Sequence, residues 1–202
     1  MICWRRPAET TIRNLLEQQD HLDVNYDAPG STRRATSPEG YRFDVNRVRL
    51  GQGDAVFKAA RQAVCRWRMF DIGWAELFVL GSDGQAFATV EPAEGQTVTA
   101  LFRLPPVWWL TPCRVIYTID EQADGRQFGF AYGTLPGHPM RGEEQFLVEM
   151  DDRGVCWFSI TAFSQARHLL SRLGHPVVRR IQQRFVRQSL QAMQRAVNHV
   201  HA

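Results

Sequence analysis

The chain has 202 residues, of which 44% are hydrophobic and 22% are charged. This composition suits one domain with a substantial core and excludes a wholly disordered chain. No apolar run approaches the ~20 residues that cross a bilayer. The start of the chain has no apolar stretch behind its arginines, so we expect no signal peptide.

The cysteines stand singly along the chain, without a CxxC pair. This spacing argues against a zinc site or a disulfide framework and is typical of a cytoplasmic protein. We therefore expect a cytoplasmic protein with no metal and no cofactor. The four residues are Cys3, Cys65, Cys113 and Cys156.

Residues 1–40 are expected to form an N-terminal extension. A short helix is predicted over Glu9–Gln19, with Thr10 or Thr11 as its cap. The segment Asp27–Thr32 then interrupts regular structure. The apolar stripe of this helix is Ile12, Leu15 and Leu16.

A first strand is predicted over Tyr41–Leu50, where apolar and polar residues alternate. Gly51–Gly53 turns the chain into a helix over Asp54–Arg68. Short runs separated by Gly, Pro and Asp clusters then predict further strands, close enough to pair as antiparallel hairpins. These strands are expected at Ala75–Leu80, Thr97–Leu104, Cys113–Asp120, Arg126–Thr134, Glu143–Met150 and Val155–Phe163.

The last element is a long amphipathic helix over Pro176–His199, with proline in its first turn. The region from Arg153 to Ala202 holds eight Arg and no Asp or Glu, so its formal charge is +8. Because the whole chain has a net charge of +3, the rest of the chain has a charge of −5. The apolar stripe of the helix is Val178, Ile181, Phe185, Ala192, Met193, Ala196 and Val200. The opposite side carries Arg180, Arg184, Arg187 and Arg195.

The order of strand, helix, six strands and long C-terminal helix resembles the helix-grip arrangement of the START, Bet v 1 and polyketide-cyclase superfamily. The fold class is therefore expected to be α+β, with a curved antiparallel sheet of about seven strands and a long helix packed on it. Residues 41–202 are expected to form this single domain. The resemblance implies an apolar cavity for a hydrophobic molecule.

A closer resemblance, over Val24–Val197, is to a family of bacteria and plants known as domain of unknown function nineteen-ninety. That family usually has a Tyr-x-Glu-Val-Gly-Ala-Thr-like opening, from which Tyr26–Thr32 departs here. The resemblance implies no activity. It is carried by Trp67–Phe70, Gly73-Trp74, Pro112–Val115, Phe128–His138, Gly142–Glu144 and Ala162–Ser164.

The run Phe128–Phe146 places one His and two Glu near a turn. Because side chains alternate along a strand, Tyr132 and Glu144 are predicted to face the core, opposite one another in a hairpin centred on His138, with Glu143 facing away. Partial burial would raise the pKa of Glu144 and make it an acid or base near neutral pH.

Other interpretations of this region remain open. Glu144 at a strand end can be solvated or paired with Arg141, and His138 can be an exposed loop tip. Cys113 can be a buried small hydrophobe or can pair with His138 as a nucleophile. A metal site is disfavoured, because adjacent glutamates on a strand face opposite ways.

Two surfaces suggest further contacts. Val107–Leu110 is predicted to be a hydrophobic loop in which Trp108 and Trp109 form a lid, a membrane-touching edge, an interface or ordinary packing. The Arg180, Arg184, Arg187 and Arg195 side is either a solvated face or a weak contact for an anionic membrane surface. No motif for specific nucleic-acid recognition is present.

The favoured function is binding of a hydrophobic or amphipathic small molecule, without catalysis. The expected ligand contacts are Tyr117, Phe128, Phe130, Tyr132, His138, Glu144, Phe146, Trp108 and Trp109. The first alternative is a cyclase, dehydratase or hydrolase that uses Glu144 as acid or base, with Tyr132 or His138 orienting the substrate. The second is a peripheral membrane or protein-interaction module using the arginine-rich helix.

Overall fold

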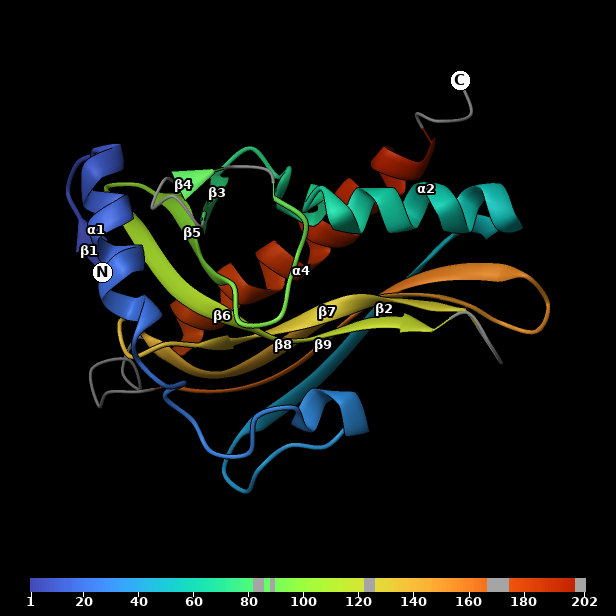
Figure 1. The fold of residues 1–202 in the computed structure, drawn as a ribbon, viewed down its shortest axis with the longest axis horizontal. Coiled ribbons are helices and arrows are strands. Elements are labelled where there is room, and N and C mark those ends of the chain that lie inside the picture. Colours follow the sequence, from blue (N-terminus) through green and yellow to red (C-terminus); the bar gives the residue numbers. More distant parts are fainter. Residues whose placement is uncertain (82–85, 88–89, 122–125, 167–174, 199–202) are drawn as a thin grey trace.

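A curved antiparallel sheet wraps around two helices in the computed structural model, which describes residues 1–81, 86–87, 90–121, 126–166 and 175–198 (Figure 1). The strands run in the order β2-β9-β8-β7-β6-β5-β3-β4, and β1 pairs with β6. They are β1 (Ile2–Cys3), β2 (Arg42–Gln52), β3 (Ala75–Leu80), β4 (Ala86–Phe87), β5 (Thr97–Leu104), β6 (Val107–Glu121), β7 (Gln127–Thr134), β8 (Met140–Met150) and β9 (Val155–Ala166).

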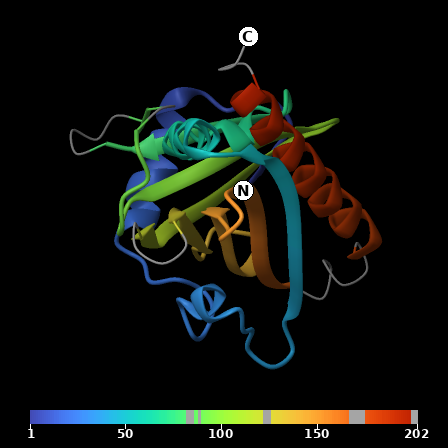
Figure 2. The same cartoon turned by 90° about the vertical axis from the view of Figure 1, so that its right-hand side faces the viewer.

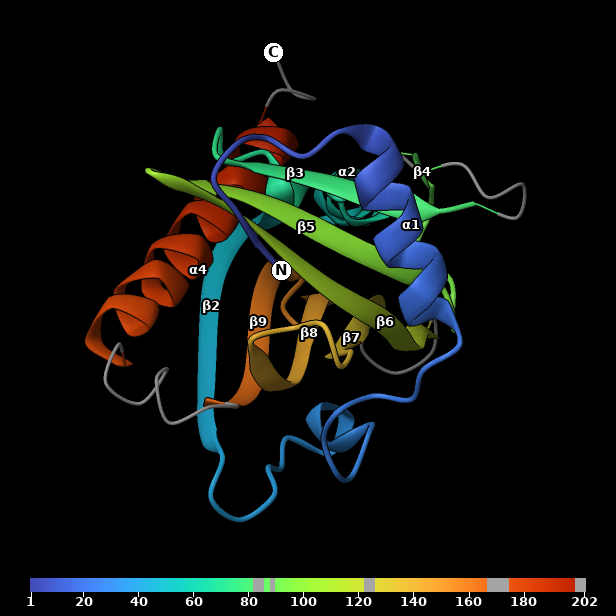
Figure 3. The same ribbon diagram turned by 90° about the vertical axis from the view of Figure 1, so that its left-hand side faces the viewer.

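The helices cover both faces of this sheet. α2 and α4 lie on its concave face, and α1 lies on the convex face against β5 and β6 (Figures 2 and 3). The predicted α+β helix-grip fold is confirmed, and the two-residue strands β1 and β4 were not foreseen. The helical elements are α1 (Glu9–Asp20), η1 (Ser31–Arg34), α2 (Asp54–Cys65), η2 (Arg68–Phe70) and α4 (His175–Asn198).

β6 begins earlier than predicted. Val107–Leu110 is a strand rather than a loop: β5 and β6 meet at Pro105–Pro106, and Trp109 lies opposite Phe102. Trp109 also lies opposite Ile2 of β1. The prolines mark the turn, and the aromatic and branched residues after them favour extended backbone.

A β-bulge in β6 overturns the predicted orientation of Tyr117. The pairing of β6 with β7 shifts between Val115 and Tyr117, so one extra residue reverses the alternation. Cys113 and Val115 belong to the core on the concave face. Tyr117 and Ile119 pack on the opposite face instead. The prediction that Tyr117 faces inward was therefore wrong.

α2 encloses one half of the concave face. It ends at Cys65, three residues before the predicted end, because Trp67 adopts a left-handed backbone conformation with φ 53°. Trp67 is 2% exposed, and its ring lies 4.5 Å from that of Phe130. This half of the sheet is a filled core, including Phe128, Phe130 and Phe146.

α1 is held on the convex face by apolar and polar contacts. Ile12 and Leu16 are fully buried there against β5 and β6. Arg114 donates hydrogen bonds to the carbonyl oxygens of Gln19 and Asp20, so it satisfies the C-terminal end of the helix. The predicted threonine cap was wrong: Ala8 is the N-cap residue and makes no side-chain cap.

The N-terminal segment contacts the sheet at three places, through β1, α1 and η1. The boundary at residue 41 stays a prediction. α4 begins at His175, so its proline lies in the first turn as expected, whereas Val200 lies outside the described residues. Within the described part of the chain, no helix is long and apolar enough to cross a membrane.

Candidate functional site

A cavity of about 390 Å³ lies between the concave sheet and the first half of α4. Its apolar walls come from the sheet, from η2 and from α4, since β5, β6, β9, η2 and α4 all contribute side chains. A volume of this size lies within the ~300–1,000 Å³ typical of small-molecule sites. Apolar residues that line it include Leu77, Val98, Ala100, Ile160, Ile181 and Leu190.

Aromatic side chains form one continuous wall of the cavity. The ring of Phe70 lies 6.5 Å from that of Tyr132 and 5.5 Å from that of Phe185. Phe102 continues the row, 5.7 Å from Phe185 and 5.2 Å from Trp74. The sequence interpretation missed this wall, although Phe185 lies on the predicted apolar stripe of the last helix.

Glu144 and Tyr132 bring a polar pair into this apolar space. They lie directly opposite one another on β8 and β7, which confirms the predicted register. The Tyr132 hydroxyl donates to the Glu144 carboxyl at 2.7 Å. Burial raises the pKa of Glu144 to about 7, despite the opposing effect of this hydrogen bond. The pairing of Glu144 with Arg141 is not observed among the described contacts.

His138 lies in the turn between β7 and β8 and lines the same cavity. Its Nδ1 lies 2.9 Å from the Met140 backbone nitrogen, whose N–H donates to it, and 3.2 Å from the Met140 carbonyl oxygen. Burial lowers the pKa of His138 to about 3. His138 is therefore a neutral lining residue rather than an exposed loop tip.

Cys113 also lines the cavity and is 4% exposed. Burial, together with the nearby Glu144, raises the pKa of its thiol well above the usual value. A thiol that resists ionisation is a poor nucleophile. These surroundings favour the buried small hydrophobe over a Cys113–His138 pair.

The predicted ligand contacts divide into two groups. Trp109, Tyr132, His138 and Glu144 line the cavity. The others do not: Trp108 packs against α1, and the Tyr117 hydroxyl bonds Thr32 at 2.7 Å on the convex face. Phe128, Phe130 and Phe146 lie in the filled core beneath α2 rather than in the cavity.

The mouth of the cavity carries a salt bridge that joins α4 to β2. Both terminal nitrogens of Arg179 donate to the Asp44 carboxylate at 2.9 Å, with both side chains about a quarter exposed or less. Arg180, Arg184, Arg187 and Arg195 are exposed as expected, and Arg184 covers the Trp74 ring. Their contact with an anionic membrane stays a prediction.

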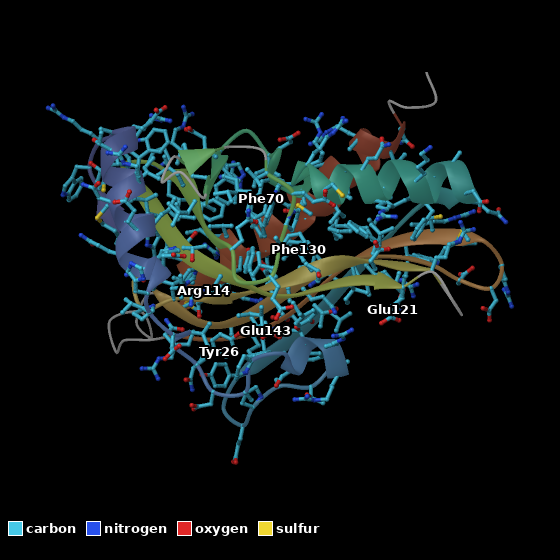
Figure 4. The ribbon with its side chains drawn as sticks, in the orientation of Figure 1. Tyr26, Phe70, Arg114, Glu121, Phe130 and Glu143 are labelled. Carbon is cyan, nitrogen blue, oxygen red and sulfur yellow. The ribbon has the colours of Figure 1, made fainter. Side chains whose placement is uncertain are left out.

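Glu143 points away from the cavity, as predicted, but it is only 2% exposed. Its carboxyl group accepts hydrogen bonds from the Tyr26 hydroxyl at 2.7 Å and from the Gly30 N–H at 2.6 Å. The Thr32 N–H at 2.9 Å and the Thr32 hydroxyl complete the set. Glu143 thus anchors the segment around η1 beneath the sheet, whereas Phe70 and Phe130 lie on the other side (Figure 4). In the described chain, no cluster of three metal-ligating side chains occurs.

The fold and the cavity define an α+β protein of helix-grip architecture with a largely apolar chamber under its C-terminal helix. The chain belongs to the family described as domain of unknown function (DUF1990), whose model matches residues 25–192.

Relatives in distant organisms match over nearly their whole length. A UPF0548 protein of Deinococcus radiodurans is 34% identical over 204 residues, covering 97% of this chain and 98% of that protein. A UPF0548 protein of Dictyostelium discoideum is 31% identical over 215 residues, covering 98% and 96%. The similarity to these relatives therefore extends through both the sheet and the N-terminal segment.

Solved structures show a more distant likeness. Ara h 8.0201 has a TM-score of 0.48 at 12% identity, covering 79% of this chain and 99% of that one. Norcoclaurine synthase from Thalictrum flavum, in complex with dopamine and hydroxybenzaldehyde, has a TM-score of 0.47 at 10% identity, covering 88% and 94%. The fold class rests on the architecture of this chain described above.

Proposed function

We propose that this protein binds a hydrophobic or amphipathic small molecule in the cavity between the sheet and α4. The observation that carries the proposal is the unequal filling of the concave face. Under α2, the large side chains around Trp67 close the core. Under the first half of α4, about 390 Å³ stays open although aromatic and aliphatic side chains surround it. Apolar space of this volume suits a ligand.

Filling the cavity is expected to weaken ligand binding. Ala100 lies on β5, lines the cavity and is only 6% exposed, so Ala100→Phe places a ring in the open volume. We expect the affinity for Nile red, a neutral apolar dye, to fall at least about fivefold, because the ring competes for the same space. Fluorescence titration of the purified protein measures this loss.

Ala55→Phe is the matched control, since Ala55 is exposed on α2 outside the cavity. It should bind the dye as the unchanged protein does, and circular dichroism should show that both variants are folded. Equal dye binding by folded Ala100→Phe would contradict the proposal. Native mass spectrometry with organic extraction offers a direct search for a copurifying molecule.

A second candidate function, proton transfer to or from a bound substrate, is favoured by Glu144. A carboxyl group whose pKa is about 7 can take and return protons near neutral pH. The adjacent Tyr132 hydroxyl, which donates to Glu144, would orient the substrate by accepting a hydrogen bond from it. His138, which is neutral and lines the same cavity, can orient the same substrate.

Hydrogen exchange next to a carbonyl tests this second function. The protein is incubated with beta-tetralone in heavy water, and deuterium uptake is followed by mass spectrometry. We expect acceleration over buffer that rises with pH to about 7, and a loss of about 10²-fold or more in Glu144→Gln. Acceleration that persists in Glu144→Gln would exclude Glu144 as the base.

A further inference from the structure

We propose that the ligand of this cavity is an amphipathic amine, whose protonated nitrogen binds the Glu144 carboxylate and whose apolar body lies along the aromatic wall. This inference rests on the proposed function and specifies the chemical class of its ligand.

The first support is that Glu144 lacks a cationic partner among the described residues. Its hydrogen bond comes from the Tyr132 hydroxyl, and no ion pair involves it. A carboxylate in an apolar chamber is costly unless a positive charge compensates it. A ligand ammonium group would supply that charge and up to three hydrogen-bond donors.

The second support is that the positive groups around the cavity are committed elsewhere or exposed. Arg179 is held by Asp44 through two hydrogen bonds. His138 is neutral, because its pKa is about 3. Arg141 and Arg187 are exposed at the rim. The Glu144 carboxyl group inside the cavity therefore has no positive partner from the arginines at the rim.

The third support is the aromatic wall that begins at the partner of Glu144. Tyr132 is followed by Phe70, Phe185, Phe102 and Trp74, with neighbouring ring centroids 5.2–6.5 Å apart. Aromatic faces attract organic cations, and they do so more strongly where water is excluded. A carboxyl group at one end of such a wall matches an ammonium head on an apolar body.

Proton linkage gives this inference a measurable signature. The pKa of Glu144 is about 7, so its carboxyl group is mostly protonated at pH 6 and mostly ionised at pH 8. At pH 6 an ammonium ligand must displace this proton. The affinity for the ligand should therefore rise about tenfold from pH 6 to pH 8. Glu143 faces the convex side. The other ionisable groups that line the cavity with Glu144 are Asp44 of β2, Cys113 of β6, Tyr132 of β7, His138 of the β7–β8 turn, Arg141 of β8, and Arg179 and Arg187 of α4.

These neighbours do not produce the same slope. Cys113 and Tyr132 have pKa values raised well above their ordinary ones, so both stay protonated from pH 6 to pH 8. His138 stays neutral, and arginines stay charged. Asp44 is bound to Arg179 at the mouth.

The test compares decylamine, decyl alcohol and decanoic acid as competitors of Nile red, because they share one chain length and differ in the head group. At pH 8 we expect decylamine to bind at least about tenfold more tightly than the alcohol. The advantage should shrink about tenfold at pH 6 and vanish in Glu144→Gln. Glu149→Gln is the matched control, since Glu149 lies on the same strand and pairs with Arg47 outside the cavity.

The outcomes separate this inference from the proposed function. Displacement by the alcohol or the acid as strongly as by the amine would overturn the amine proposal and leave cavity binding intact. An amine preference that survives in Glu144→Gln would also overturn it. Failure of all three compounds and of Nile red itself to bind would instead overturn the proposed function.

Discussion

Replacing Glu143 with alanine is expected to lower the free energy of unfolding by about 3–5 kcal/mol. The substitution removes the acceptor of four hydrogen bonds in a place that water does not reach, since Glu143 is 2% exposed. The Tyr26 hydroxyl and the Thr32 amide would remain buried without a partner, and the partly buried Gly30 amide would lose its acceptor. Each orphaned donor costs ~1–3 kcal/mol. Urea denaturation followed by circular dichroism measures the loss.

Glu121→Ala is the matched control for this prediction. Glu121 is also a glutamate on the strands near η1, but its side chain is 57% exposed and its ion pair with Arg33 spans 3.6 Å. Its replacement should change the free energy of unfolding by less than about 1 kcal/mol. A loss below that value in Glu143→Ala would mean that the segment around η1 is held by other contacts.

The sequence predicted the scaffold well because strand alternation and turn residues are local signals. The bounds of β3 and β5 match the prediction, and the hairpin of β7 and β8 has the register inferred from symmetry about His138. That register correctly places Tyr132 opposite Glu144. Short-range patterns were sufficient there, because a strand pair with a tight turn leaves little freedom.

The orientation of Tyr117 was lost because a β-bulge has no reliable signal in a single sequence. One extra residue between Val115 and Tyr117 reverses the alternation that the prediction extended along the strand. The prediction of a loop at Trp108 and Trp109 was wrong for a different reason. Prolines on both sides suggested a loop, but Pro112 is accommodated within β6.

The burial of Glu143 depends on contacts more than 100 residues apart in the chain, which periodicity cannot reveal. Tyr26–Thr32 departs from the usual opening of the family, yet it agrees at Tyr26, Gly30 and Thr32. These are the residues that bind Glu143. Gly30 has φ 83°, a conformation that glycine adopts without strain. A family motif that looked unrelated to the Gly142–Glu144 run is therefore its structural partner.

The boundary between cavity and filled core was also beyond the sequence. Phe130 and Phe146 alternate inward as predicted, but α2 and Trp67 fill the space above them. Two strand positions further along, Tyr132 and Glu144 face the space under α4, which remains open. The same alternation of inward-facing residues occurs in the filled core and in the cavity. The two regions differ in the helix that covers them, α2 over the core and α4 over the cavity.

Replacing Glu144 with glutamine is expected to stabilise the protein at pH 8 and to have little effect on its pH 4 stability. The folded-state pKa of about 7 exceeds the ordinary value of 4.5. Between these values the folded protein holds a proton that the unfolded chain releases. The free energy of unfolding therefore falls as pH rises from about 4.5 to about 7, by about 2–3 kcal/mol, and is flat above. Glutamine carries no such penalty.

The measurement is the difference in free energy of unfolding between Glu144→Gln and the unchanged protein, taken by urea denaturation from pH 4 to pH 8. Other titrating groups cancel in this difference, because both proteins contain them. Glu149→Gln, on the same strand but paired with Arg47 at the surface, should give a difference that is nearly independent of pH. A flat profile for Glu144→Gln would show that water reaches the Glu144 carboxyl freely, and the apolar environment assigned to this end of the cavity would then be wrong.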